Sequence, residues 1–446
     1  MSNTLKRKMK LAVFLTSDGS YHLAGWRLPE SYPDGGYNIH RWSEFARTME
    51  RGKLDMLFIA DGSGLSGTDD MNSLSYTSRI DRMDPVTIVS ALAMVTQRLG
   101  LVCTVSTSYH APYNVARAMA SIDHISGGRA GWNIVTSAGR EDALNFGLDA
   151  QVPHAERYER AEEFVDVVRG LWDSYDSNAF PHDKSSGRFM NPDAVHFLNH
   201  KGKHFSVRGP LNVARSPQGH PVLVQAGSSE VGMNLSARVA DVVFTSQSSV
   251  EGTRAFSDDV KGRCVNYGRS PDSLKVMLGV FLFIGRTEEE AWEKYEKLQG
   301  LIPIQVALQR LSLNLGGIDL SKFDLDKPAP EVSANSARVS SIDAYLQIIR
   351  REKLTLREMA MRSAAAKHHW TVIGSPKQIA DQLEDMFVNG GADGFNIICS
   401  DVPAGLNNFV DLVVPELQAR NLFRTEYEGK MLRENLGVSP INERLH

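Results

Sequence analysis

Short apolar runs alternate with segments of helical periodicity along most of this 446-residue chain. Eight of the apolar runs are expected to be strands: Lys10–Leu15, Asp55–Asp61, Leu101–Thr107, Ala130–Ser137, Pro221–Ala226, Asp241–Thr245, Leu274–Ile284 and Gly394–Ser400. Because about as many helical segments follow them, the pattern predicts an α/β fold of the (β/α)8 type, a TIM barrel. A doubly wound parallel sheet is the alternative fold.

Two stretches interrupt this alternation, at about 175–219 and about 300–370. The first is rich in Pro, Gly, His and Asn, and the second contains Pro328, Pro330 and a serine-rich run. Long insertions are ordinary in barrels, where loops at the carboxyl ends of the strands build the active site. Since barrels of this length form one unit, the sequence predicts a single barrel domain over 1–446 that carries both insertions.

The composition argues against several classes of protein. The net charge of −4 and the pI of about 6.4 give no strong attraction to nucleic acid or to an anionic membrane. No apolar run approaches the roughly 18 residues that span a bilayer. Cys103, Cys264 and Cys399 are widely spaced and form no metal or redox motif. We therefore expect a cytoplasmic protein without nucleic-acid or membrane partners.

Two motifs suggest chemistry that their context does not support. Gly62–Gly67 matches the dinucleotide-binding fingerprint, but no helical periodicity begins inside it, so an active-site loop is the better interpretation. His196, His200 and His204 are spaced like zinc ligands on a helix. Because Gly202 interrupts any helix there, the three side chains are not expected to converge, and no metal site is predicted.

Polar side chains gather at the carboxyl ends of the predicted strands, where a barrel places its active site. Asp61 ends the second strand, Ser106–His110 end the third, Asn133–Ser137 lie along the fourth, and Gly227–Ser229 follow the fifth. Such positions suit a planar, largely apolar ring that is held by a few polar groups. The sequence therefore predicts a ligand site in the barrel mouth.

Motifs spread over the chain carry a family resemblance. They include Phe58–Asp61, Val105–Tyr113, Asp123–Ser137, Asn145–Gly147, His154–Tyr158, Lys201–Phe205, Val224–Ser229 and Gly391–Asn396. Together, from about Lys10 to Phe423, these motifs resemble the nitrilotriacetate monooxygenase component A family of FMN-dependent, bacterial-luciferase-like enzymes.

This resemblance implies a two-component flavin-dependent monooxygenase. Its cofactor would be FMN as FMNH2, supplied by a separate NAD(P)H:flavin reductase, with no metal. The enzyme would use O2 to oxygenate a small organic substrate through a flavin hydroperoxide. The resemblance also implies a homo-oligomer.

The resemblance also implies roles for individual residues. Those that would line the flavin ring and ribityl chain are Asp61, Thr107, Asn133 and Ser137. Those that would lie near the ribityl–phosphate end are His154, Tyr158, Ser228 and Ser229. The two serines directly precede the helix expected at Glu230, so their hydroxyls and its first free amides suit a phosphate. Purely structural roles stay open: Asp61 pairing with an arginine, Asn133 satisfying backbone groups, and Ser228 acting as a helix cap.

A histidine with a near-neutral pKa would suit proton transfer in such a reaction. His22 is the first candidate because it precedes Trp26-Arg27, as a histidine does in the family, and His110 is the second. The alternative for His22 is a loop histidine that orients the backbone.

The substrate is not predicted beyond its being a small organic molecule, because the two insertions would shape its site. Arg188, Arg338 and Arg362 are candidates for binding an anionic substrate. Two other functions stay open: a deazaflavin-dependent oxidoreductase of the same superfamily, and a non-catalytic flavin-binding barrel.

Overall fold

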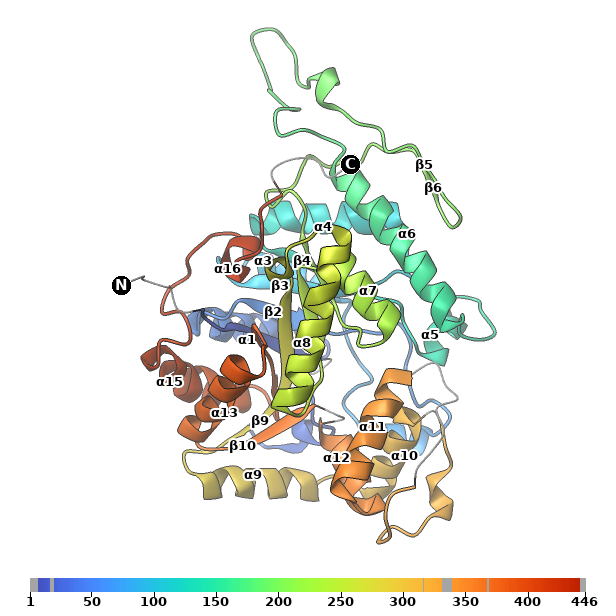
Figure 1. Ribbon diagram of the computed structural model, residues 1–446, viewed down its shortest axis with the longest axis vertical. Coiled ribbons are helices and arrows are strands. Elements are labelled where there is room, and N and C mark those ends of the chain that lie inside the picture. Colours follow the sequence, from blue (N-terminus) through green and yellow to red (C-terminus); the bar gives the residue numbers. More distant parts are fainter. Residues whose placement is uncertain (1–6, 17–19, 316, 331–338, 367–368, 442–446) are drawn as a thin grey trace.

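The computed structural model describes residues 7–16, 20–315, 317–330, 339–366 and 369–441. A closed parallel sheet forms its centre (Figure 1). In barrel order its strands are β1 (Lys10–Leu15), β2 (Met56–Ile59), β3 (Gly100–Ser106), β4 (Ala130–Val135), β7 (Val222–Gln225), β8 (Val242–Thr245), β9 (Lys275–Ile284) and β11 (Gly394–Cys399). Because β9 pairs with both β8 and β11, the sheet has no open edge there. The (β/α)8 prediction is confirmed, and the doubly wound alternative is wrong.

A ninth strand, β10 (Trp370–Gly374), was missed in the sequence. It pairs in parallel with the second half of β9, from Val280 to Ile284, whereas β8 pairs with the first half. The strand has only five residues and lies at the end of the stretch that was predicted as an interruption. The run Leu274–Ile284 was predicted as one strand, but nothing in its own residues indicates that two different strands pair with its successive halves.

Helices surround the sheet and bury one face each against it (Figure 1). The principal ones are α1 (Ile39–Arg51), α3 (Pro85–Ala93), α4 (Pro112–Ser126), α6 (His154–Trp172), α7 (Glu230–Val239), α8 (Val250–Cys264), α9 (Glu288–Gly300) and α13 (Pro376–Asn389). Asp84 caps α3 by accepting from the Thr87 amide, and Pro85 occupies its first turn. No helix among the described residues is long and apolar enough to cross a bilayer.

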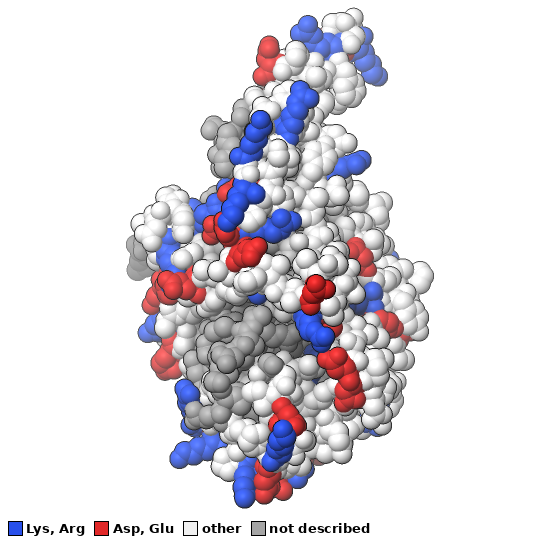
Figure 2. Space-filling view, turned by 90° about the vertical axis from the view of Figure 1, so that its right-hand side faces the viewer, with Lys and Arg blue, Asp and Glu red and all other residues white. Residues whose placement is uncertain are grey.

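The first interruption forms an arm that projects beyond α4 and α6 (Figure 1). It contains a short antiparallel pair, β5 (His200–Lys201) with β6 (Ser206–Val207). Lys and Arg side chains are spread along this arm in the space-filling view (Figure 2). Because the arm begins after Trp172, at the end of α6 opposite to His154, it lies away from the carboxyl ends of the barrel strands.

The second interruption contains α10 (Ile304–Asn314), α11 (Val339–Glu352) and α12 (Leu356–Ala366). The short helix α2 (Met71–Leu74), from the segment after β2, contacts α10. These helices share a buried apolar cluster that includes Leu311, Tyr345 and Met359. The described part of this stretch is thus packed and helical.

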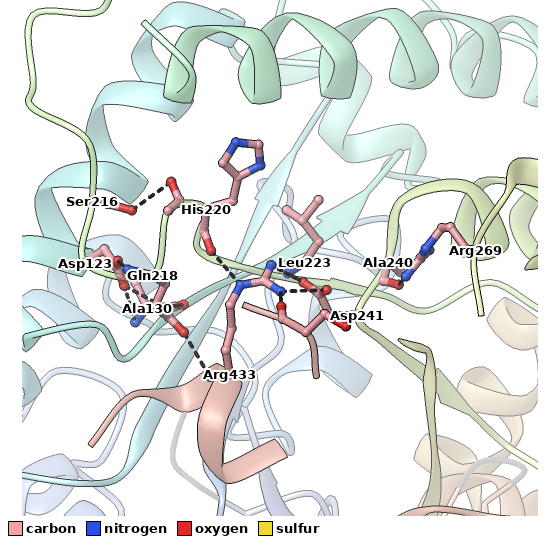
Figure 3. A network of polar contacts seen from close by, with 12 residues as sticks. Asp123, Ala130, Ser216, Gln218, His220, Leu223, Ala240, Asp241, Arg269 and Arg433 are labelled. Carbon is pink, nitrogen blue, oxygen red and sulfur yellow. Dashed lines mark hydrogen bonds and ion pairs between the residues drawn. The ribbon is translucent and has the colours of Figure 1, made fainter. Parts of the chain in front are cut away.

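The chain ends in α14 (Ala404–Asn408), α15 (Val414–Ala419) and α16 (Leu432–Leu436). Arg433 of α16 donates to both carboxylate oxygens of Asp241, at 3.0 and 2.7 Å, and to the His220 carbonyl oxygen at 2.9 Å (Figure 3). The Arg433 amide donates to Gln218, whose side chain donates to Asp123. Because Asp241 and His220 precede β8 and β7, this network fastens the C-terminal segment to the amino ends of the strands.

Candidate functional site

A pocket of about 480 Å³ lies at the carboxyl ends of the strands. Phe14 of β1 lines it, together with residues that directly follow β2, β4 and β7. Six of the nine residues singled out in the sequence line this pocket: Asp61, Ser137, His154, Tyr158, Ser228 and Ser229. Segments that are far apart in the chain therefore converge as a barrel mouth requires.

Thr107 and Asn133 do not line the pocket. Thr107 is fully buried, and its hydroxyl donates to the Val135 carbonyl oxygen at 3.2 Å. Asn133 points into the barrel interior, where its amide nitrogen donates to Thr104 at 2.8 Å. The Asn133 side-chain oxygen has no hydrogen-bond partner among the described residues. Both residues support the strands that carry the pocket instead of forming its surface.

His22 is also away from the pocket surface. Its side chain is 1% exposed, its Nδ1 accepts from the Ala24 amide at 3.1 Å, and its ring packs against Phe281 and Phe283. Burial, assisted by the nearby Arg79, lowers the pKa of His22 to about 3. The ring is therefore neutral at physiological pH, and its contacts match the alternative of a loop histidine that orients the backbone.

One wall of the pocket is the N-terminus of α7. Ser229 caps this helix, with its Oγ accepting from the Gly232 amide at 3.3 Å. A Cβ at Gly232 would lie only 3.1 Å from the Tyr158 hydroxyl, so glycine here lets that hydroxyl approach the first turn. This side of the pocket is thus lined by the first amides of α7, the hydroxyls of Ser228 and Ser229, and the phenol of Tyr158. Such a helix N-terminus favours a phosphate or another anion.

Arg157, which was not predicted from the sequence, adds a positive charge to this side of the pocket. The residue is 2% exposed and lines the pocket. Its Nε donates to the Val152 carbonyl oxygen at 2.9 Å, and its Nη1 donates to the Ser137 carbonyl oxygen. Its Nη2 is buried without a hydrogen-bond partner among the described residues. A buried guanidinium nitrogen without a partner is costly, and an anion in the pocket would satisfy it.

The signal for Arg157 was present in the sequence. It lies three residues after His154, and residues at that spacing share a face of a helix. Only the two ends of the motif, His154 and Tyr158, were predicted to belong to the site, and their rings lie with centroids 4.8 Å apart.

Asp61 forms an ion pair with Arg82, with 3.3 Å between Oδ1 and Nε. Burial raises the pKa of the Asp61 carboxyl to about 6, although Arg82 opposes the shift. The pair stands at the border between the main pocket and a second pocket of about 480 Å³, which Ser137 and His110 also line. Asp61 therefore pairs with an arginine, as one alternative held, and it also faces the pocket.

The glycine-rich segment after β2 is a loop that covers this border. The Gly64 amide donates to Asp142 at 2.5 Å, and the Gly64 carbonyl oxygen accepts from Arg82 at 3.1 Å. A Cβ at Gly64 would lie 2.5 Å from the Asp142 amide nitrogen. Glycine is needed here for close approach to α5 (Arg140–Asn145), and the next helix begins only at Met71. Both facts agree with an active-site loop instead of a dinucleotide fingerprint.

The raised pKa of Asp61 predicts a pH-dependent effect of Asp61→Asn. The ordinary pKa of the carboxyl is 3.8, and in the folded protein it is about 6. Between pH 3.8 and about pH 6 the folded protein therefore binds the proton more tightly than the unfolded chain does. Above pH 6 the carboxylate is ionised in both states, and its burial destabilises the fold. At pH 8 the variant is expected to gain about 1–3 kcal/mol in free energy of unfolding. At pH 4 the gain should largely disappear. Urea denaturation at both pH values checks this, and an equal gain at both would contradict it.

The histidines at zinc-like spacing diverge. His196 contacts Asp176 at 2.9 Å, whereas His200 contacts Glu163 at 2.8 Å. Within the described ranges, no group of three or more metal-ligating side chains is placed to hold an ion.

Comparison with known proteins agrees with this fold. The family model for luciferase-like monooxygenases matches residues 9–394. Nitrilotriacetate monooxygenase component A of Aminobacter aminovorans is 47% identical over 433 residues, which cover 96% of each chain. The structure of DmoA from Hyphomicrobium sulfonivorans superposes with a TM-score of 0.89 at 31% identity, over 98% of this chain and 94% of that one.

A riboflavin lyase crystallised with modified FMN and riboflavin is a further structural neighbour. It has a TM-score of 0.85 and 30% identity, and the match covers 98% of both chains. The match to the family model and the near full-length identity lead to the same conclusion. This chain is an enzyme of the luciferase-like monooxygenase family.

Proposed function

We propose that this enzyme is the oxygenase of a two-component system and uses reduced FMN and O2 to oxygenate a small organic substrate. The observation that carries the proposal is the wall built by Arg157, Ser228, Ser229 and the first turn of α7. It presents a buried guanidinium nitrogen, two hydroxyls and free amides to one space. This donor set fits a phosphate monoester such as that of FMN. When bound, reduced FMN supplies the electrons with which O2 is activated.

The chain's own residues would bind and orient the cofactor. Arg157, Ser228 and Ser229 would hold the phosphate, with His154 and Tyr158 beside the ribityl chain. Asp61 and Ser137 would face the flavin ring, and the loop over Gly62–Gly67 would limit the entry of water. Ser137 supports this role because it has a φ of +44°, a strained conformation that a strand end keeps where function requires it.

Asp61 is better placed than His22 to hold a proton near neutral pH. Its carboxyl lines the pocket and has a pKa of about 6, whereas His22 is buried away from the pocket with a pKa of about 3. Thr107 and Asn133 would act beneath the cofactor by fixing the ends of β3 and β4.

The remaining features of the proposal come from relatives. The name component A in a 47% identical protein supports a separate component, which we propose to be an NAD(P)H:flavin reductase. The riboflavin lyase crystallised with modified FMN supports FMN over a deazaflavin. We also propose one barrel domain with two insertions, a homo-oligomeric assembly and a cytoplasmic location.

Ser229→Ala is expected to weaken FMN binding about 10-fold, because it removes one hydrogen bond to the phosphate. It also removes the cap of α7, which is expected to cost about 1 kcal/mol of stability. Ser249→Ala is a matched control, since Ser249 caps α8 in the same way, by accepting from the Gly252 amide at 3.1 Å, and does not line the pocket. Both variants should lose similar stability in thermal denaturation. Equal losses of FMN affinity in fluorescence titrations would contradict the phosphate role of Ser229.

The function itself is tested by turnover. The enzyme is mixed with FMN, NADH, a generic flavin reductase and a panel of small organic substrates under ¹⁸O₂. We expect substrate-dependent oxygen consumption and one labelled oxygen atom in the product. Failure of both oxidised and reduced FMN to bind at micromolar concentration would overturn the proposal, and tight flavin binding without any labelled product would indicate a non-catalytic barrel.

A further inference from the structure

A pocket of about 620 Å³ lies at the amino ends of the strands, at the end of the barrel opposite to the candidate active site. It is lined by Leu223, near the start of β7, and by Asp241, directly before β8. Arg169 from the last turn of α6 and Arg238 from the last turn of α7 also line it. None of its lining residues lines the main pocket. The two pockets are therefore separate sites.

Arginine dominates the polar lining of this pocket. Its lining residues include four arginines, Arg169, Arg238, Arg269 and Arg433, whereas Asp241 is the one carboxylate among the lining residues that the structure describes. Figure 3 shows Arg433 and Arg269 on either side of Asp241. A cleft lined by charges of one sign attracts ligands of the opposite sign unless neighbouring groups balance those charges.

Three of these arginines do have partners. Arg433 binds both carboxylate oxygens of Asp241. Arg238 donates to both carboxylate oxygens of Asp166, at 2.8 and 3.1 Å. Arg269 donates to three carbonyl oxygens at the C-terminal end of α7, at 2.6 to 3.4 Å, where a cation offsets the negative end of the helix dipole. The charges of these three groups are therefore largely balanced.

Arg169 differs from the other three. Its guanidinium makes no hydrogen bond or ion pair with any residue that the structure describes. Burial lowers the pKa of Arg169; Asp166 opposes this shift and the nearby Arg238 adds to it. Asp166 is also the carboxylate that Arg238 binds. A partly buried cation without a partner of its own destabilises a fold, and such a group is typical of a functional site.

The rest of the lining suits a phosphate group. The terminal oxygens of a phosphate accept hydrogen bonds from several donors at once, and a guanidinium fork binds two of them together. The Nε of Arg238 is buried without a hydrogen-bond partner among the described residues, and Ser270 and Ser273 add hydroxyl groups. Pro440 and Ile441 add apolar surface. A volume of about 620 Å³ also leaves room for an organic part attached to the phosphate.

We propose that this pocket binds a phosphate group, either as free phosphate or as part of a small phosphomonoester, through Arg169 with the help of Arg238 and Arg269. The bound phosphate would connect α6 with the end of α7, beside the ion pair that fastens the C-terminal segment. It would stabilise the protein, because a ligand that binds only the folded state favours that state. The inference does not rest on the proposed function, since the candidate active site lies at the other end of the barrel.

The arginines that were predicted as candidates for an anionic substrate are different ones. Arg188 is exposed on the arm, Arg362 is paired with Glu352, and Arg338 lies outside the described residues. Arg169 was not predicted, because it lies in no recognisable motif and its isolation depends on tertiary packing.

Isothermal titration calorimetry of the full-length protein in phosphate-free buffer tests the inference. The titrants are inorganic phosphate, AMP, and adenosine, which has no phosphate. Wild type and Arg157→Ala both serve as parent proteins, because the second lacks the arginine of the proposed FMN phosphate site. We expect phosphate or AMP to bind both parents at millimolar concentration or below, and the affinity to fall about 10-fold or more when Arg169→Met is added to Arg157→Ala. Arg169→Lys should keep part of the affinity.

Arg160→Met is the matched control. Arg160 also lies on α6 and is also partly buried, but its guanidinium lies over the Phe205 ring and does not line the pocket, so phosphate affinity should stay unchanged. Thermal denaturation adds a readout that a purely structural role of Arg169 would move in the opposite direction. Without phosphate, Arg169→Met should be at least as stable as its parent, because it removes an unpartnered cation and keeps an apolar side chain. Phosphate should raise the melting temperature of the parent and not that of Arg169→Met.

The two titrants distinguish the source of the phosphate group. Tighter binding of AMP would identify a phosphomonoester, and tighter binding of inorganic phosphate would identify the free ion. No binding of either to Arg157→Ala, equal affinity with and without Arg169→Met, or adenosine binding as tightly as AMP would overturn the inference. So would a clear loss of stability in Arg169→Met without phosphate, or phosphate binding that is seen only after removal of residues 442–446. Failure of FMN to bind would contradict the proposed function and leave this site standing.

Discussion

Arg157→Ala is expected to weaken FMN binding about 100-fold or more. The change removes the guanidinium that faces the proposed phosphate site, and hydrogen bonds from charged groups contribute about 1.5–3 kcal/mol each. It also removes the bonds from Arg157 to the carbonyl oxygens of Val152 and Ser137, which position the end of β4 beside the cofactor. Arg157→Lys should recover only part of the affinity, because an ammonium cannot make the same set of bonds. Fluorescence titration with FMN measures the effect.

Two comparisons show whether the loss concerns the phosphate. Arg160→Ala removes a guanidinium of α6 that lies over the Phe205 ring and does not line the pocket, so it should leave FMN affinity unchanged. Riboflavin lacks the phosphate, so its affinity should fall much less than that of FMN in Arg157→Ala. An equal loss for riboflavin and FMN would mean that Arg157 shapes the pocket without binding the phosphate.

Arg433→Met is expected to lower the free energy of unfolding by about 3–5 kcal/mol, because it leaves Asp241 buried without its partner. Arg433 is 3% exposed and also bonds the backbone of His220 and Ser439, so the change detaches the C-terminal segment from the barrel (Figure 3). Chemical denaturation followed by circular dichroism measures this loss. FMN affinity of the remaining folded protein should be unchanged, since the network lies at the opposite end of the strands.

Arg420→Met is the matched control for burial. Arg420 contacts three carboxylates, Asp381, Glu384 and Glu416. Their side chains are 36–55% exposed, against 11% for Asp241, so the loss should be about 1 kcal/mol or less. The double variant Arg433→Met with Asp241→Leu should recover part of the stability, because no charge is then left unpaired. A larger loss in Arg420→Met than in Arg433→Met would contradict the account of the network.

The barrel could be predicted from the sequence because its strands are fully buried apolar runs separated by amphipathic helices. The positions of Asp61, Ser137 and Ser229 followed from that pattern, since the carboxyl ends of parallel strands meet at one edge. β10 could not be predicted, because its partner is the overhanging half of β9.

The parts of the site that escaped prediction depend on tertiary packing. The burial of His22 follows from its contacts with β9, which its own segment does not encode. The packing of α10, α11 and α12 around one apolar cluster also escaped prediction, because composition reveals neither those contacts nor which face of α10 is buried. Arg157 lies inside the motif His154–Tyr158, but its importance comes from its Nη2, which is buried without a hydrogen-bond partner among the described residues, and tertiary packing decides that.

A crystal structure of the enzyme with bound FMN would locate the cofactor phosphate. We predict the phosphate within hydrogen-bond distance of Ser229 Oγ and Arg157 Nη2, at the first turn of α7, with the flavin ring toward Asp61. A phosphate that lies away from both the first turn of α7 and the Arg157 guanidinium would contradict the proposed cofactor site.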